Sequence, residues 1–350
     1  MCIRDSGYTG YTHLMENVGQ TSNRGVELSL TGYIMDRPDF TLNATFNIGR
    51  NKNKIDKLAR GEKEMVLSSG WAGSQLLNSD DYRAYVGGTT GLIYGFVNDG
   101  FYTVDDFKPF DSKSRTWTLK DGVVNSSPLS GDPRPGNAKF KKLTPVDENS
   151  ANPYTLTDDD RTVIGNTTPK FSGGFGLNAT FKGFDVSAFF NFMYDFDVFN
   201  ANKVMMTTWA SNNYNNFSMD ISAAKRWRNF DDMGNEIRYS PEILAEFNKN
   251  ATMWNPTSIG RPIAMSYAVE DGSFLRLNTA TIGYTLPRAW TNKVGLSRVR
   301  FYASGYNLFT ITGYSGYDPE VDIATGLTPN IDNNRYPRSR TYTFGVQLTF

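Results

Sequence analysis

The chain has 350 residues, with 36 basic and 36 acidic side chains, one cysteine and one histidine. The balanced charge lacks the basic surface of nucleic-acid-binding proteins, and one cysteine with one histidine excludes a disulfide framework and the usual ligand sets of structural zinc. No stretch approaches the roughly 18 consecutive apolar residues of a transmembrane helix, and the first residues lack the apolar segment of an export signal.

Two amphipathic strands are predicted near the start of the chain. Residues 23–34 and 40–48 alternate between apolar and polar side chains, a period of two that is typical of strands with one apolar face. The segment 36–39, with its proline and aspartates, predicts a tight turn between them. The Lys-rich segment 51–64 predicts a loop, and a second hairpin is expected over 82–102.

Further strands are separated by three long irregular stretches. The clearest hairpin covers 171–192, with a turn at Lys182 and Gly183, and strands are also predicted at 273–286 and 298–310. The irregular stretches are 103–170, 194–271 and 311–340. Connections of this length are uncommon within a compact domain and require a functional reason.

The last ten residues also alternate strictly, with small or polar residues between five apolar ones. The apolar set is Tyr342, Phe344, Val346, Leu348 and Phe350. A soluble sheet with one buried face can show this alternation. However, the length matches the about 9–11 residues that a tilted strand needs to cross a bilayer, and terminal aromatic residues are typical of the girdles of transmembrane barrels.

The order of turns and long stretches favours the barrel. Short connections at 36–39, 182–183 and 287–297 alternate with the long stretches, and outer-membrane barrels pair tight periplasmic turns with long extracellular loops. The sequence therefore predicts an all-β fold, with about ten antiparallel strands of a large transmembrane β-barrel.

Period two also predicts which residues share a face of the barrel wall. Lipid is expected to contact Leu177, Ala188 and Val346, and the lumen Asn178, Ser187 and Gln347.

Several motifs resemble the SusC/RagA-type TonB-dependent outer-membrane transporters. The most distinctive lies in segment 272–287 and comprises Gly272, Ser273, Phe274, Leu275, Arg276, Leu277, Gly283, Tyr284 and Pro287. Weaker matches occur in the order and spacing of the family along the chain, from 23–27 (NRGVE) through 317–320 (YDPE) to 336–337 (YP). The resemblance implies that 1–350 is the C-terminal part of the barrel domain. The plug, TonB box and signal peptide of the family are expected upstream and are absent from this sequence.

The resemblance implies an outer-membrane transporter that is not an enzyme and needs no cofactor. Its function would be TonB-dependent import of a nutrient, an oligosaccharide or a peptide, together with a SusD-like surface lipoprotein. The other expected partners are the TonB complex, the outer-membrane assembly machinery and membrane lipid. A passive porin and a secreted glycan-binding β protein are the alternative functions.

Aromatic residues supply the candidate functional positions. The substrate-contact candidates are Trp209, Tyr214, Phe217 and Trp254. Their rings could stack on sugars or could pack the loop against itself or a partner, and the sequence leaves both readings open. The alternating residues that end at Phe350 are the expected assembly signal, with simple anchoring at the membrane interface as the alternative.

No catalytic residue or metal site is predicted. His13, the sole histidine, has no nucleophile motif beside it. The acidic run 158–160 could help to hold a cation, but such runs are usually solvated, and segment 145–156 replaces the Asp-rich run of the family, so no calcium site is carried over. Arg276 and Asn278 are expected to fix strand ends rather than to touch substrate.

Overall fold

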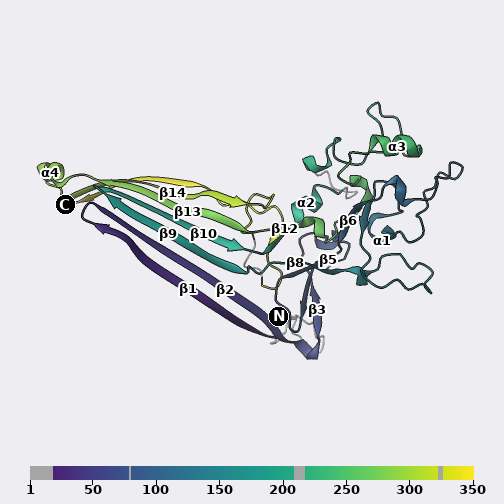
Figure 1. Ribbon diagram of the computed structural model, residues 1–350, viewed down its shortest axis with the longest axis horizontal. Helices are drawn as coiled ribbons and strands as arrows, with labels where there is room; N and C mark the ends of the chain where they lie inside the picture. Colours follow the sequence, from purple (N-terminus) through teal and green to yellow (C-terminus); the bar gives the residue numbers. More distant parts are fainter. Residues whose placement is uncertain (1–18, 79, 209–216, 322–325) are drawn as a thin grey trace, which may run out of the picture.

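The computed structural model of the protein describes residues 19–78, 80–208, 217–321 and 326–350. It consists of a long sheet and, at one end of that sheet, a more compact region that we call the head (described residues of 59–170, 195–273 and 313–340) (Figure 1). The long strands are β1 (Gly19–Arg37), β2 (Phe40–Leu58), β9 (Phe171–Phe181), β10 (Phe184–Tyr194), β13 (Phe274–Thr285), β14 (Arg298–Thr312) and β16 (Thr341–Thr349). Within the described ranges, no helix has the length and apolar character needed to cross a membrane.

The long strands form one antiparallel sheet in the order β1-β2-β9-β10-β13-β14-β16. Strands far apart in the sequence are neighbours in it, since β2 pairs with β9 and β10 pairs with β13. This arrangement confirms the predicted all-β fold built on a large antiparallel sheet. Seven strands belong to the sheet, and it does not close, because β1 and β16 each have one partner among the described strands. The hairpin predicted over 82–102 belongs to the head instead.

The tight turns lie at the end of the sheet opposite the head (Figure 1). Between β9 and β10, Lys182 and Gly183 have φ angles of +45° and +90°. Two consecutive positive φ angles characterise the hairpin turns whose twist matches that of the strands. The connection between β13 and β14 lies at the same end and contains α4 (Arg288–Thr291) and the 3-10 turn η8 (Asn292–Val294). The predicted separation of short turns from long stretches is confirmed.

The prediction of a loop over 51–64 is wrong for its first half. Strand β2 continues to Leu58 and pairs with β1 as far as Gly19. Asn23 lies opposite Asn53, whose side-chain amide donates a hydrogen bond of 3.0 Å to the Asn23 side-chain oxygen. The backbone ladder therefore keeps this segment extended, although its lysines remove the apolar alternation from which strands are read.

The head is built from short strands that come from distant parts of the sequence. They are β3 (Glu64–Leu67), β4 (Tyr82–Tyr85), β5 (Leu92–Gly95), β6 (Asn98–Phe101), β7 (Ala138–Phe140), β8 (Thr162–Asn166), β11 (Asp197–Asn200), β12 (Val269–Asp271) and β15 (Ile331–Asp332). The helices are α1 (Ser127–Ser130), α2 (Ala201–Met205) and α3 (Pro241–Phe247). Single 3-10 turns are η1 (Ala59–Gly61), η2 (Gly73–Gln75), η3 (Val104–Asp106), η4 (Asp158–Asp160), η5 (Met219–Ile221), η6 (Pro256–Ser258) and η7 (Ser266–Ala268). Small sheets with the orders β3-β4-β5-β8, β12-β11-β15 and β6-β7 connect these pieces.

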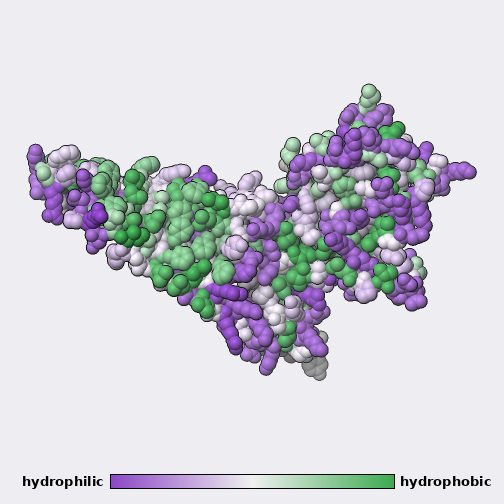
Figure 2. Space-filling model, in the orientation of Figure 1, coloured by the Kyte–Doolittle hydropathy of each residue, from purple (hydrophilic) through white to green (hydrophobic). Residues whose placement is uncertain are grey.

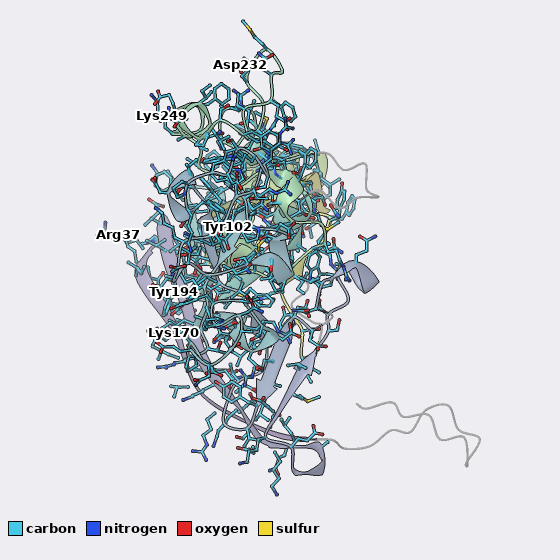
Figure 3. All side chains as sticks on the ribbon, turned by 90° about the vertical axis from the view of Figure 1, so that its right-hand side faces the viewer. Arg37, Tyr102, Lys170, Tyr194, Asp232 and Lys249 are labelled. Atoms are coloured by element: carbon cyan, nitrogen blue, oxygen red, sulfur yellow. The ribbon has the colours of Figure 1, made fainter. Side chains whose placement is uncertain are left out.

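The head has a hydrophobic core of its own. Its main cluster includes Tyr82, Phe96, Phe199 and Trp254, which come from widely separated positions in the chain. Figure 3, which looks onto the head, places Tyr102 inside it, and the buried Tyr102 hydroxyl donates a hydrogen bond of 2.6 Å to the Val124 carbonyl oxygen. The described parts of the stretches that showed no periodicity are therefore folded, and they add apolar residues to a shared core.

Candidate functional site

One face of the sheet is apolar across the six strands from β2 to β16. Cross-strand partners lie on the same face, so the register defines rows of side chains that run across the sheet. One row consists of Ala44, Leu177, Ala188, Ala280, Gly305 and Tyr342. The next row towards the turns consists of Leu42, Ala179, Val186, Ile282, Ala303 and Phe344. In Figure 2 these strands carry a broad hydrophobic area, and many of the side chains are exposed in the open sheet.

Aromatic rows border this apolar face on both sides. The row at the turn end consists of Phe40, Phe181, Phe184, Tyr284, Phe301 and Val346. The row nearer the head consists of Phe46, Phe175, Phe190, Leu277 and Phe309. In this second row the rings of Phe175 and Phe190 are stacked, with centroids 4.7 Å apart. Phe175 and Phe181 are six positions apart in β9, about 20 Å at the rise of a strand. An apolar band between two aromatic girdles is the surface that a barrel presents to lipid.

The opposite face is polar and is cross-linked by side-chain hydrogen bonds. Thr281 and Ser304 are 2.8 Å apart at their hydroxyl oxygens, and Asn178 donates to the Asn43 side-chain oxygen over 3.0 Å. Asp185 accepts hydrogen bonds from Arg300, including one of 2.9 Å from Nε. The residues predicted for the lumen share this face and those predicted for lipid share the other, so the division between faces is confirmed.

Arg276 projects from β13 on the polar face and holds a segment of the head against the sheet. It is only 2% exposed and donates a 2.5 Å hydrogen bond through Nη2 to the Asp318 carboxylate. Its Nη1 lies 3.0 Å from Oε2 of Glu320, and its Nε donates to the Thr310 hydroxyl at 3.0 Å. Arg338 pairs with the other oxygen of Glu320 at 2.8 Å. This network, which we call the Arg276 cluster, joins β13 and β14 to the stretch 311–340.

The Arg276 cluster agrees with the structural role expected for Arg276. The sequence had assigned no role to Asp318 and Glu320, although both lie in the motif 317–320. Asp318 and Glu320 are two residues apart in a loop that follows a predicted strand, and this spacing was the feature of the sequence that could have indicated their role. A buried arginine requires compensating carboxylates, and the motif 317–320 supplies two of them.

The neighbouring signature residues meet packing requirements. A Cβ atom on Gly272 would lie 2.5 Å from the Phe196 ring, and one on Gly283 would lie 2.5 Å from the Arg300 guanidinium. Glycine therefore leaves room for the Phe196 ring at the first position and for the Asp185–Arg300 pair at the second. Tyr284 belongs to the aromatic row at the turn end, where its ring contacts that of Phe184 at 4.5 Å.

The four substrate-contact candidates are not brought together among the described residues. Trp209 and Tyr214 lie outside the described residues. Phe217 is 42% exposed, whereas Trp254 is only 2% exposed and packs edge-on against Tyr267. The burial of Trp254 supports the packing alternative for this residue.

The acidic run 158–160 caps a turn. Asp160 is fully buried and accepts hydrogen bonds from the backbone N–H groups of Leu143 and Thr144 at 2.9 and 2.8 Å and from that of Thr157 at 2.8 Å. Burial alone would raise the pKa of Asp160, but these hydrogen bonds and one from the Thr144 hydroxyl stabilise the anion and hold the pKa far below its usual range. The carboxylate oxygens of Asp160 are thus occupied by protein donors.

Comparison with known proteins identifies the relatives of this chain. No protein-family model matches it. TonB-dependent receptor P3 of Formosa agariphila is 30% identical over 349 residues, which are 98% of this chain and 30% of the receptor. TonB-dependent receptor SusC of Bacteroides thetaiotaomicron is 24% identical over 344 residues, which are 96% of this chain and 27% of SusC. Over almost its whole length the chain is therefore similar to part of several TonB-dependent receptors, SusC among them.

Solved structures agree on the fold of this chain. A structure of the RagAB peptide transporter superposes with a TM-score of 0.64 at 22% identity, covering 99% of this chain and 31% of that one. The closed-closed state of the RagAB peptide importer gives a TM-score of 0.63 at 24% identity, over 99% and 32% of the two chains. The chain spans less than a third of these chains, and about the same fraction of P3 and SusC.

Proposed function

We propose that this chain is part of the barrel and extracellular head of a nutrient importer in the outer membrane, energised through TonB. The observation that carries the proposal is the girdled apolar face of a sheet that ends in a separately folded head. Outer-membrane barrels have this combination of a lipid-facing band, tight periplasmic turns and large extracellular loops. Homology to TonB-dependent receptors over 98% of the chain supports the same function.

The proposed role involves no chemical step. In a bilayer every backbone polar group needs a partner, so the unpaired edges of β1 and β16 require further strands of the complete receptor. The polar face would line the lumen, and a plug supplied upstream would close it until TonB acts. A SusD-like lipoprotein would cover the head and retain the nutrient, which we propose to be an oligosaccharide or a peptide.

Uptake measurements in cells test this function. Cells that carry the complete receptor should accumulate a labelled nutrient against its gradient, and the loss of TonB should reduce accumulation to the level of cells without the receptor. A passive porin would still equilibrate the nutrient without TonB. A secreted binding protein would be recovered from the medium rather than from the outer membrane. Either result would contradict the proposal.

The last strand is proposed as the assembly signal, formed by Tyr342, Phe344, Val346, Leu348 and Phe350. All five side chains are at least half exposed, and β16 pairs only with β14 among the described strands. The strand therefore offers both an apolar face and a free backbone edge to a machine that recognises strands.

Deleting Phe350 should slow assembly in cells and leave folding in vitro almost unchanged. Phe350 follows the last residue of β16 and is 90% exposed, so its loss removes little packing from the folded sheet. Pulse-chase measurements should show unassembled receptor in the periplasm, while the purified variant folds into lipid vesicles at the normal yield. Exchanging Thr349 and Phe350, which moves the aromatic ring to the other face, should give the same defect. Normal assembly of the deletion variant would leave Phe350 the role of an interfacial anchor.

A further inference from the structure

The head contains a cavity of about 770 Å³ that the import proposal does not use. Its wall comes mainly from the stretches 115–117, 129–137, 229–239 and 257–261. The volume falls within the range of about 300–1,000 Å³ that is typical of small-molecule sites. The charged residues that line it are Arg115, Arg134, Arg238, Arg261 and Asp132. Four guanidinium groups therefore face one carboxylate.

Three of the four arginines are held in place by neighbouring groups. The guanidinium carbons of Arg115 and Arg238 lie 5.2 and 5.7 Å from the centre of the Tyr239 ring. Arg261 donates hydrogen bonds of 3.1 and 2.9 Å to the carbonyl oxygens of Gln75 and Leu76. Guanidinium groups that are already positioned lose less side-chain entropy when they bind an anion.

The positive charge of this lining is only partly neutralised within the protein. Arg238 pairs with Glu236, which lies outside the cavity lining. Within the part of the chain that the structure describes, Arg115 and Arg134 form no ion pair. Several like charges around a partly enclosed space create a positive potential that attracts anions. The planar fork of arginine matches carboxylate, sulfate and phosphate groups.

An aromatic ring lies beside these cations. Trp117 lines the cavity and packs edge-on against Phe107 and obliquely against Phe110, with ring centroids 5.4 and 4.8 Å away. These contacts fix a flat, half-buried surface on which the C–H groups of a sugar ring can pack. A linear peptide of aspartate or glutamate residues would use the arginines equally well, but those residues have no ring to place on Trp117.

We propose that this cavity binds an acidic oligosaccharide, with Arg115 and Arg134 holding a carboxylate or sulfate group and Trp117 supporting a sugar ring. The proposal rests on the import function above, since it names the class of nutrient. It places the first capture site in the head, at a distance from the polar face of the sheet.

Calorimetry on the complete purified receptor tests the proposal. The probes are oligogalacturonate, its neutral methyl ester, a sulfated galactan oligosaccharide, oligoglutamate and inorganic sulfate. At least one acidic saccharide should bind, and the double variant Arg115→Gln/Arg134→Gln should bind it at least tenfold more weakly. Asp132→Asn, which removes the only acid of the lining, should strengthen binding, a gain that misfolding cannot produce. Arg37→Gln at the far end of the sheet is the matched control and should bind normally.

The other outcomes overturn the assignment. They are failure of both acidic saccharides to bind, equal binding of the neutral ester, and equal binding of oligoglutamate or sulfate. A weaker-binding Asp132→Asn variant would also contradict it. TonB-dependent uptake without saccharide binding would support the import function and contradict the assignment of the cavity. Saccharide binding with uptake that does not need TonB would support the assignment of the cavity and contradict the import function.

Discussion

Replacing Arg276 with methionine should destabilise the folded receptor by about 3–5 kcal/mol, the usual cost of leaving buried carboxylates without their cation. Asp318 and Glu320 would both lose their contacts with the guanidinium, and Asp318 has no other basic partner among the described residues. Arg338 would still pair with Glu320. Repulsion between the carboxylates of Asp318 and Glu320 should then release the stretch 311–340 from the polar face of the sheet.

Two measurements distinguish this effect from general damage. Urea titration of the receptor folded in lipid should show the lower stability, and limited proteolysis should show faster cleavage within 311–340. The matched control is Arg298→Met, because Arg298 lies on the neighbouring strand but is exposed, with a 3.5 Å contact to the Thr285 hydroxyl. The triple change Arg276→Met/Asp318→Leu/Glu320→Met removes the buried charges together and should restore most of the lost stability. Equal effects of Arg276→Met and Arg298→Met would show that the Arg276 cluster does not hold the stretch 311–340 against the sheet.

The long strands could be predicted from the sequence because each of their faces meets a single environment. An apolar face and a polar face impose period two directly on the residues, as in 171–181 and 341–350. The extension of β2 over 51–58 could not be predicted in this way. There the strand extends past the aromatic row at Phe46, so both of its faces meet polar surroundings and only the backbone ladder with β1 keeps it extended.

For most of the head, the sequence predicted only three long irregular segments whose length requires a functional reason. Its core takes isolated residues, such as Phe96, Phe199 and Trp254, from separate short elements. None of these elements is long enough to show a period, and their pairing is decided by contacts between distant parts of the chain. The cavity arginines were missed for the same reason, since Arg115, Arg134 and Arg238 look like ordinary surface residues in the sequence.

The Arg276 cluster was predictable in part. Arginine on the polar side of an otherwise amphipathic strand indicates a partner, and the resemblance marked both Arg276 and the motif 317–320. What the sequence could not provide was the pairing between them across 42 positions. The fold supplies it, because β14 turns back along β13 and delivers the following loop to the same face.

The change Leu177→Arg should prevent most of the receptor from reaching its folded form in the membrane, whereas Asn178→Arg should be tolerated. Leu177 lies between the two aromatic rows, where an arginine that faces lipid costs roughly 2–4 kcal/mol. Asn178 is the next residue of the strand and projects from the polar face, where an arginine side chain would remain in water. Its replacement removes the hydrogen bond with Asn43, worth about 1 kcal/mol.

The two variants differ by one position in one strand, so expression, strand propensity and added charge are matched. The measurement is the fraction of receptor that migrates as heat-modifiable folded barrel in isolated outer membranes, together with the folding free energy in lipid vesicles. Leu177→Arg should lose the greater part of the folded band, and Asn178→Arg should keep most of it. Similar losses would mean that both faces meet the same solvent. In that case the girdled apolar face would be covered by protein rather than by lipid, and the barrel assignment would fail with it.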